Sequence, residues 1–303
     1  MPYIRRLLFV VLGLNGYLKL IRKSYFAIFN AGLLKTNPVY DWHYFVQNLI
    51  KRGDVILDIG ANMGYYSCLF SKLTGNRGKV YSIEPVAPLV KQLKKQIKRK
   101  KNITVLPLAL GNENKDEVCL GLPEGIRKTG YIQHGLFSIQ DPQGLKENKF
   151  VFGAAQRKGS EVFSGLTRID YIKCDVEGYE KVILKDMEPL LVRHQPMVQV
   201  EIRNDHFTEL ISFFKKIGYR AFKLDAKKLV TLEGLSSAQQ RHFDTLFVPP
   251  RHFTRIKPFT GHIDPKPINT STCKIRPAEN QSIFFYRNPS SHHNLPQANK
   301  ADG

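Results

Sequence analysis

Residues 54–67, DVILDIGANMGYYS, constrain the fold of this chain more than any other stretch. The apolar run VIL leads into Asp58 and a turn that contains Gly60 and Gly64, after which aromatic and apolar residues begin a helix. A buried parallel strand that feeds a glycine-rich turn and a helix opens a nucleotide-binding βαβ unit. Glycines let the backbone approach a ligand closely, and the helix offers free N–H groups. We therefore expect a ligand with a nucleoside part at this turn.

The chain between residues 54 and 248 alternates between strand-like and helix-like patterns. This alternation predicts an α/β fold with a doubly wound, Rossmann-like sheet. Seven runs are expected to be its strands, in chain order VILD, KVYSIEP, NITVLPLAL, IDYIKCD, PMVQVEI, YRAFKL and DTLFVPP. Ligands of such sheets bind beyond the carboxyl ends of the strands, so residues that follow the strands are the candidate site residues.

Composition divides the chain into three parts. Residues 38–250 are expected to form the sheet domain, within which the aperiodic stretch 117–165 is interpreted as a lid or substrate-binding insertion. Residues 1–37 form a basic and apolar helical extension. Eight of the 17 prolines lie in residues 249–303, so residues 251–303 are predicted to be a Pro-rich, partly disordered tail.

The net charge of +20 is concentrated toward the ends of the chain. Residues 1–53 carry eight Lys and Arg against one acid, and residues 249–303 carry eight against three. This excess favours contact with an anionic surface or a polyanionic substrate near the termini. The alternative is that basic flanks only keep the chain soluble.

Residues 1–29 contain no apolar run long enough for a membrane span. As a single helix they would place apolar residues roughly on one side, namely Leu7, Leu8, Val11, Leu14, Leu18 and Ile21. Such a helix can make a peripheral contact with an anionic membrane, or it can dock on the domain's own surface. The sequence leaves both interpretations open.

The cysteines bear on location. Cys68, Cys119, Cys174 and Cys273 are far apart and form no CxxC pair. They indicate neither a disulfide framework nor a zinc cluster, which fits a reducing compartment. We therefore expect a cytoplasmic protein, with peripheral binding at the inner face of the membrane as an additional possibility.

The glycine turn differs from a dinucleotide-binding fingerprint. That fingerprint needs G-x-G-x-x-G, whereas Gly60 and Gly64 are separated by three residues, Asn62 replaces the middle glycine, and no GK[ST] follows. The turn suits S-adenosylmethionine, whose aminoacyl end can lie against it. Glu84 ends the second strand, where a carboxylate can accept hydrogen bonds from two ribose hydroxyls. Asp58 can hold the ligand's ammonium group, or it can serve only to cap the turn.

The motifs taken together resemble one methyltransferase family. In chain order, DVILDIGANMGYYS, YSIEP, PLALGN, IDYIKCDVEGYEKVILKDMEPLL and VQVEI are similar to the motifs of the FkbM-type S-adenosylmethionine-dependent methyltransferases. The resemblance covers roughly residues 50–250 and leaves both flanks unexplained. It departs from the family at Cys174, where an aliphatic residue is more usual, and in the segment just before that strand.

The resemblance implies a seven-stranded class I methyltransferase fold, with S-adenosylmethionine as methyl donor. It further implies an O-methyltransferase that acts on a hydroxyl of a saccharide, glycan or related metabolite. The residues then expected to bind the donor are Asp58, Gly60, Ala61, Asn62, Gly64, Glu84, Pro85 and Ala109.

Several polar residues follow the fourth and fifth strands and can face the acceptor: Asp175, Glu177, Glu201, Arg203, Asn204 and His206. Either Asp175 or Glu177 is a candidate base, or the two together can hold a divalent metal ion that acidifies the hydroxyl. Their structural alternative is that a carboxylate at the start of the next helix favours the helix dipole. His206 is a third candidate base, and His134 is its rival.

Two other functions compete with this hypothesis. The pI and the Lys-rich helix near residues 91–101 suggest an RNA 2′-O-methyltransferase. Against binding of nucleic acid, the chain has DVEG where amino-methylating enzymes of bases carry [ND]PP[YFW], and it contains no Pro-Cys. The other alternative is a non-catalytic, membrane-associated binding protein on the same fold, which the presence of Gly60, Gly64 and Glu84 disfavours.

Overall fold

The computed structural model describes residues 2–121, 138–139, 151–202, 206–232 and 243–261, all within one compact unit, Met1–Asn269. The described α-helices are α1 (Pro2–Asn30), α2 (Asp41–Phe45), α3 (Tyr65–Thr74), α4 (Ala87–Gln96), α6 (Gly159–Val162), α7 (Glu180–Asp186), α8 (Glu188–His194), α9 (Phe207–Lys216) and α10 (Phe253–Ile256). The described strands are β1 (Val55–Ile59), β2 (Lys79–Ile83), β3 (Ile103–Leu106), β4 (Ala109–Gly111), β5 (Lys115–Gly121), β6 (Ser138–Ile139), β7 (Phe152–Lys158), β8 (Tyr171–Cys174), β9 (Met197–Ile202), β10 (Arg220–Asp225), β11 (Lys228–Thr231) and β12 (Phe243–Val248). Short 3-10 helices flank α2 at Pro38–Tyr40 and Val46–Asn48, follow α3 at Gly75–Arg77, and flank α10 at Pro250–His252 and Lys257–Phe259.

Eight described strands form the main sheet, in the order β3-β2-β1-β8-β9-β12-β10-β11. The first five pair in parallel, and β12, β10 and β11 add to β9 through antiparallel pairs. The predicted doubly wound α/β fold is confirmed. The sheet has one strand more than the seven expected, because Ala226 and Lys227 take positive φ and turn β10 back into the edge strand β11.

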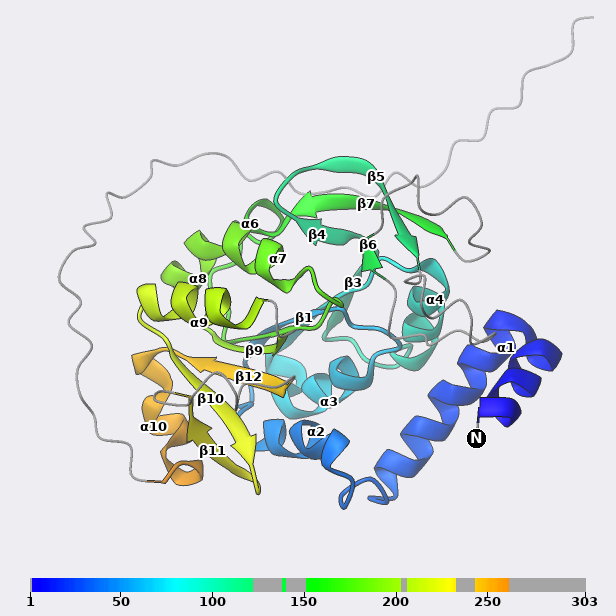
Figure 1. The fold of residues 1–303 in the computed structure, drawn as a ribbon, viewed down its shortest axis with the longest axis horizontal. Coiled ribbons are helices and arrows are strands. Elements are labelled where there is room, and N and C mark those ends of the chain that lie inside the picture. Colours follow the sequence, from blue (N-terminus) through cyan, green and yellow to red (C-terminus); the bar gives the residue numbers. More distant parts are fainter. Residues whose placement is uncertain (1, 122–137, 140–150, 203–205, 233–242, 262–303) are drawn as a thin grey trace, which may run out of the picture. The chain divides into compact units, whose positions relative to one another are not determined.

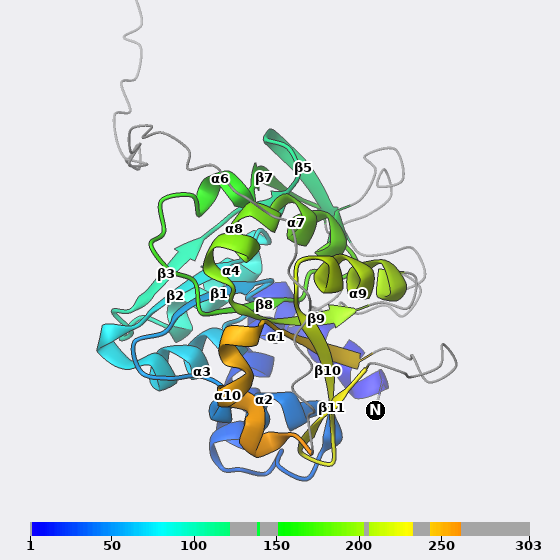
Figure 2. The ribbon, with the colours of Figure 1, turned by 90° about the vertical axis from the view of Figure 1, so that its left-hand side faces the viewer.

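Helices cover both faces of this sheet (Figures 1 and 2). Helices α7, α8 and α9 lie on one face, where Leu184, Leu191 and Phe214 are buried against the strands. Helices α2 and α3 lie on the other face, where Trp42 and Phe70 are buried. Because both faces are covered, β1 needs apolar residues in succession, which is the pattern that its sequence has.

A smaller sheet, in the order β4-β7-β5-β6, is built from the segment after β3. In Figure 1 it lies at the top of the molecule, above the main sheet. It takes in the described ends of the predicted insertion 117–165, while residues 122–137 and 140–150 lie outside the described residues. The role of this insertion as a lid therefore stays a prediction.

Helix α1 is broken at Gly13, whose φ of 61° and ψ of 178° are not helical. Because of this break, the prediction that residues 1–29 form one helix with its apolar residues on a single side is wrong. Leu18 is buried in a cluster with Met63 and Leu89, whereas Leu7, on the other side of the break, is exposed. Thus residues 14–30 dock on the domain and residues 2–12 do not continue that face. No helix in the described part of the chain is both long and apolar enough to cross a bilayer.

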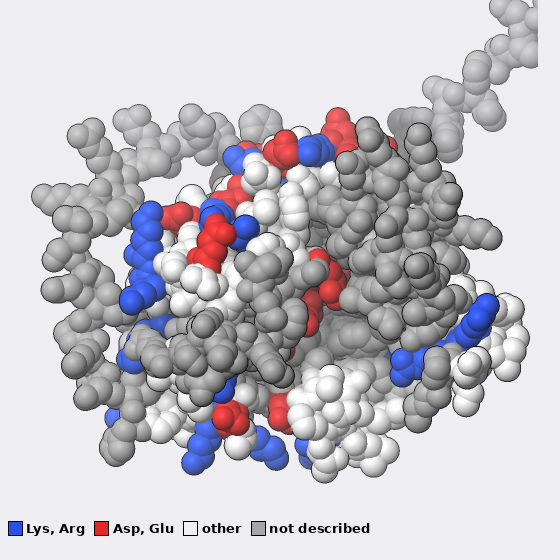
Figure 3. All heavy atoms as spheres, in the orientation of Figure 1, with Lys and Arg blue, Asp and Glu red and all other residues white. Residues whose placement is uncertain are grey.

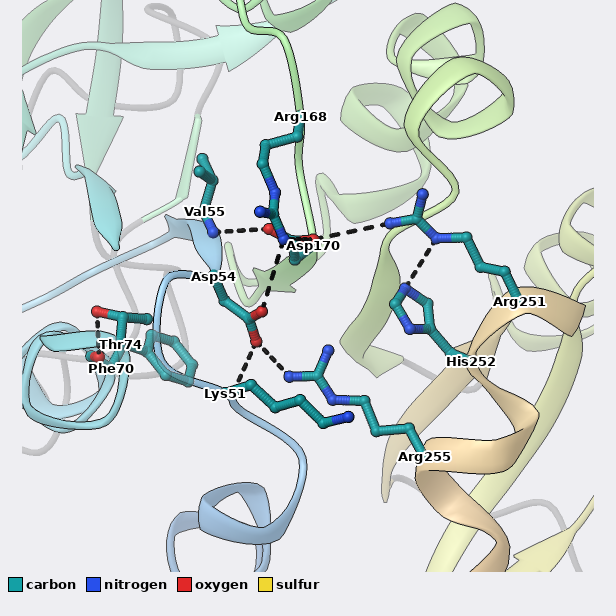
Figure 4. A network of polar contacts seen from close by, with 10 residues as sticks. All are labelled: Lys51, Asp54, Val55, Phe70, Thr74, Arg168, Asp170, Arg251, His252 and Arg255. Carbon is teal, nitrogen blue, oxygen red and sulfur yellow. Dashed lines mark hydrogen bonds and ion pairs between the residues drawn. The ribbon is translucent and has the colours of Figure 1, made fainter. Parts of the chain in front are cut away.

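The predicted start of the tail at residue 251 is wrong, since the chain stays folded through α10. Ile256 is fully buried in the cluster on the α2 and α3 face. Arg255 forms an ion pair with Asp54, which precedes β1, and Asp170 accepts a hydrogen bond from the Val55 N–H at 2.8 Å (Figure 4). The prediction took the many prolines as a sign of disorder. Proline is well tolerated in the first turn of a helix, and it occupies that place in the short helices that occur here.

Arg255 is expected to be important for stability. Its side chain is 6% exposed, and that of Asp54 is 5% exposed, so the Arg255→Met variant leaves a buried carboxylate without its main partner. We expect the free energy of unfolding to fall by about 3–5 kcal/mol. Urea unfolding followed by circular dichroism measures the change.

The matched control is Arg251→Met. The Arg251 side chain is 40% exposed and lies 3.7 Å from Asp170, so it belongs to the same network but remains in contact with solvent. Its replacement should lower stability by less than about 1 kcal/mol. Equal losses in the two variants would contradict the assignment.

Candidate functional site

A pocket opens at the carboxyl ends of the parallel strands β1, β2, β8 and β9. The space-filling view shows acidic side chains in a hollow near the centre of one face of the molecule (Figure 3). Seven of the eight residues predicted to bind the donor line the pocket: Asp58, Gly60, Ala61, Asn62, Glu84, Pro85 and Ala109. Gly64 is not among its described lining residues and instead precedes α3 with φ of 88°.

The turn after β1 fits tightly against the neighbouring strands. Gly60 has φ of 79°, and a Cβ there would lie 1.8 Å from the carbonyl oxygen of Asp175. The N–H groups of Gly60 and Ala61 donate to the carbonyl of Ile83 at 3.0 and 2.9 Å. Only glycine satisfies both the backbone angle and the space at this position. The sequence therefore specifies a turn that is held from both sides by β2 and β8.

Glu84 connects that turn to the end of β2. Its Oε2 accepts a hydrogen bond from the Asn62 N–H at 2.8 Å, and its Oε1 accepts one from the Val86 N–H at 2.9 Å. Burial raises the pKa of Glu84 to about 7, although these two donors act in the opposite direction. Each carboxylate oxygen has a second lone pair, so Glu84 can still accept hydrogen bonds from a pair of ligand hydroxyls.

Asp58 is fully buried at the floor of the pocket. Its Oδ2 accepts a hydrogen bond from Ser67 at 2.5 Å, while Oδ1 has no partner among the described residues. Burial raises its pKa to about 6, against the opposing effect of Lys173. An unpaired buried oxygen is costly unless a ligand satisfies it, which fits an ammonium group or a water that binds here.

Three carboxylates come together at the ends of β8 and β9. Oxygen atoms of Asp175, Glu177 and Glu201 lie within 4.8 Å of one another, and Lys173 contacts Asp175 at 2.6 Å. Burial disfavours the charge on Asp175, but Lys173 and a hydrogen bond with Glu201 hold its pKa below the usual value. The negative charge of Asp175, together with burial, raises the pKa of Glu201 to about 9. The pair therefore holds its negative charge preferentially on Asp175, and a proton bound by the pair is favoured on Glu201.

The same three carboxylates have the donor set that a hard divalent cation prefers. In the absence of a cation, the Lys173 ammonium group and the proton on Glu201 already compensate much of the negative charge. The cluster can thus work as a base assisted by its neighbours, or hold an ion once Glu201 has lost its proton.

His43 lies in this pocket and was not among the predicted residues. Its ring stacks on Tyr66 with 4.0 Å between the centroids, and its buried Nδ1 has no partner among the described residues. Burial, followed by Lys173, lowers the pKa of His43 to about 3, so the imidazole stays neutral and can accept a hydrogen bond. The sequence indicated only an apolar helix around His43, because its place at the pocket depends on how α2 packs on α3.

Neither histidine predicted as a base is among the described lining residues of the pocket. His206 precedes α9 and is not among the described lining residues. His134, Arg203 and Asn204 lie outside the described residues. Asp175 and Glu177 both line the pocket, as expected for residues that follow β8.

A family model described as the methyltransferase FkbM domain matches residues 58–221, more than half of the chain. A protein-L-isoaspartate O-methyltransferase of Methanosarcina mazei is 41% identical over 59 residues, which are 19% of this chain and 24% of that protein. One of Methanococcoides burtonii is 34% identical over 77 residues, 25% of this chain and 34% of that protein. The matches thus span only a quarter to a third of these relatives.

Two solved structures are similar to this chain at lower sequence identity. A methyltransferase FkbM of Methylobacillus flagellatus has a TM-score of 0.44 and 18% identity, and the match covers 69% of this chain and 47% of that one. A fibrillarin of Aeropyrum pernix, with bound S-adenosylmethionine, has a TM-score of 0.38 and 14% identity, with coverage of 66% and 68%.

Proposed function

The chain belongs to the FkbM methyltransferase family, and from this premise we propose that it transfers the methyl group of S-adenosylmethionine to a hydroxyl oxygen of a saccharide, glycan or related metabolite. The observation that carries the proposal is one pocket with two chemically different sides. The donor side has Glu84, Asp58 and the Gly60 turn, and the acceptor side has an ionised Asp175 beside a neutral His43.

The donor side suits S-adenosylmethionine. Glu84 has lone pairs left for the two ribose hydroxyls, and Asp58 has one oxygen left for the ammonium group. The glycine at position 60 lets the turn pack directly against the Asp175 backbone, which fixes the donor side beside the end of β8. When bound, S-adenosylmethionine supplies a methyl group activated by a sulfonium centre.

The acceptor side suits removal of a proton from a hydroxyl. Asp175 is the residue best placed to take it, since Lys173 and Glu201 keep its carboxylate ionised. With the donor bound, its sulfonium would supply the methyl group to the acceptor oxygen, and Asp175 would hold the proton that this oxygen loses. Such a site would contribute by removing the hydroxyl proton and by holding the acceptor oxygen in line with the methyl carbon and sulfur. His43 can accept a second hydrogen bond from the acceptor and help to orient it.

Asp175→Asn is expected to lower kcat by about 100- to 10,000-fold, the usual contribution of a general base. The affinity for S-adenosylmethionine should change by less than about threefold, because donor binding relies on Glu84 and Asp58. A labelled-methyl transfer assay measures kcat, and calorimetry measures the affinity. An equal loss in both quantities would show that Asp175 only supports the pocket.

Two controls accompany this variant. Asp116→Asn removes a fully exposed carboxylate on β5 and should leave both quantities unchanged. Treatment of the wild type with a chelator should also leave kcat unchanged, because Lys173 and Glu201 already compensate the charge on Asp175. Loss of kcat that Mg²⁺ restores would assign the three carboxylates to a metal ion instead.

The acceptor class is tested by transfer of labelled methyl from S-adenosylmethionine to cell-envelope glycans, total RNA and an isoaspartyl peptide. We expect label in the glycan fraction, and we expect it to resist alkali, because a methyl ether is stable where a methyl ester is hydrolysed. Label in RNA would favour the 2′-O-methyltransferase alternative, for which the exposed lysines of α4 argue. Alkali-labile label in the peptide would favour the activity for which the curated relatives are named.

A further inference from the structure

The first segment of α1 presents an apolar face that the rest of the described chain does not cover. Leu7 is 64% exposed, Val10 is 71% exposed and Val11 is 70% exposed. Tyr3 and Ile4 are also exposed, and their spacing places them on the same side of a helix as Leu7 and Val11. Five large apolar side chains in one patch on a surface helix usually mark an interaction site.

This face is held in a definite orientation. Phe9 points to the opposite side of the same segment and meets the Tyr17 ring edge-on, with 5.5 Å between the centroids. The break at Gly13 therefore folds residues 2–12 back toward residues 14–30, as the dark blue end of the ribbon shows (Figure 1). The apolar face is not a disordered end but one side of a two-segment helical unit.

The unit is anchored on the wall of the donor pocket. Leu18 packs in a cluster with Val86 and Leu89, and both of these residues also line the pocket. Arg22 donates a hydrogen bond to Gln92 of α4 at 3.3 Å. Whatever binds residues 2–12 is consequently held close to the pocket.

The positive charge of α1 indicates what kind of partner binds its apolar face. The first acidic residue of the chain is Asp41, whereas six Lys and Arg precede it. Arg5, Arg6, Lys19 and Lys23 are exposed on the two segments. A second copy of this chain would bring like charges together, while an anionic lipid surface offers both hydrocarbon for the apolar face and opposite charge for its borders.

We propose that residues 2–12 form an interfacial helix that docks the protein on an anionic lipid bilayer. The apolar face enters the boundary between headgroups and acyl chains, and the arginines remain among the headgroups. The inference does not depend on the acceptor, so it can fail or hold independently of the proposed function.

Sedimentation with vesicles tests the docking. We expect the full chain to bind phosphatidylglycerol–phosphatidylcholine vesicles and to bind pure phosphatidylcholine vesicles much less. Leu7→Ser combined with Val11→Ser should weaken the vesicle affinity roughly 10- to 100-fold, because two large apolar side chains are lost from the buried face. Both positions are exposed, so the thermal midpoint and the affinity for S-adenosylmethionine should not change.

The matched control is Val39→Ser combined with Val230→Ser, which removes two exposed apolar side chains outside α1. It should bind vesicles like the wild type. Equal binding of all three proteins to anionic vesicles, or no binding by the wild type, would overturn the proposal. A concentration-dependent dimer that the Leu7→Ser and Val11→Ser changes abolish would assign the face to a second copy instead.

Discussion

Glu84→Ala is expected to weaken S-adenosylmethionine binding about 100-fold or more, because two hydrogen bonds to a charged group are worth about 1.5–3 kcal/mol each. The side chain has two functions in the pocket. We propose that it accepts hydrogen bonds from the ribose, and it holds the backbone of Asn62 and Val86 through its two oxygens. Calorimetry with wild type and variant measures the loss directly.

Glu84→Gln separates these functions. The amide keeps one acceptor oxygen for a backbone donor, but its NH₂ group faces the other donor and can accept nothing from a hydroxyl. We expect an affinity between those of wild type and Glu84→Ala. Glu113→Gln, at an exposed carboxylate paired with Lys115, is the control and should bind the donor like the wild type. Equal binding by all four proteins would remove Glu84 from the donor site.

The same carboxylate predicts a pH dependence. Burial raises the pKa of Glu84 to about 7 in the folded protein, so below that pH the group is mostly protonated and accepts ligand hydroxyls poorly. The affinity for S-adenosylmethionine should therefore rise with pH, by up to about tenfold per unit below pH 7, and level off above it. The stability of the protein without ligand should change with pH in the opposite direction. Because burial raises the pKa of Glu84, its ionisation lowers the free energy of unfolding as the pH rises from about 4.5 to 7. A donor affinity that is flat across this range would contradict the role.

Gly60→Ala is expected to have the second large effect. The new Cβ would lie 1.8 Å from the Asp175 carbonyl oxygen and 2.8 Å from its carbonyl carbon, and φ at this position is 79°. Backbone atoms cannot yield as a flexible side chain does, so β1 and β8 would have to separate where Asp175 leaves its strand. We expect a loss of about 3–5 kcal/mol in the free energy of unfolding, together with loss of methyl transfer.

Gly218→Ala is the matched control. Gly218 also has φ of 87°, but a Cβ there would meet nothing within 4 Å. The only expected penalty of this variant is that of a left-handed backbone at a residue with a Cβ, which lowers the free energy of unfolding by about 1–2 kcal/mol. The variant should keep its activity. Urea unfolding and the methyl-transfer assay compare the two variants. Equal destabilisation would mean that backbone angle alone, and not the contact with β8, makes Gly60 necessary.

The donor side could be predicted because it is local in the chain. A strand, its turn and the carboxylate that ends the next strand all lie within residues 54–84, and parallel pairing of β1 with β2 brings their ends together. The apolar run and the two glycines can be recognised in the sequence without knowledge of distant contacts. The same holds for Asp175 and Glu177, which follow β8 directly.

The errors have a common physical cause. Gly13 looked like one residue of a continuous amphipathic helix, and residues 251–261 looked like part of a Pro-rich tail. In both places the outcome depends on partners far away in the chain, namely the docking of Leu18 beside Val86 and the ion pair of Arg255 with Asp54. The local amino-acid composition of a segment does not indicate such long-range contacts.

The sequence by itself determined the sheet, the glycine turn, the place of Glu84 at the end of β2 and the family, because each rests on short-range patterns or on motifs in chain order. Only the tertiary structure decided that His43 reaches the pocket, that the pKa values of Asp175 and Glu201 are shifted in opposite directions, and that residues 2–12 expose an apolar face. The reason is that protonation and exposure are set by the charges and surfaces that surround a group in space. Helix packing brings those neighbours together from parts of the chain that are far apart in sequence.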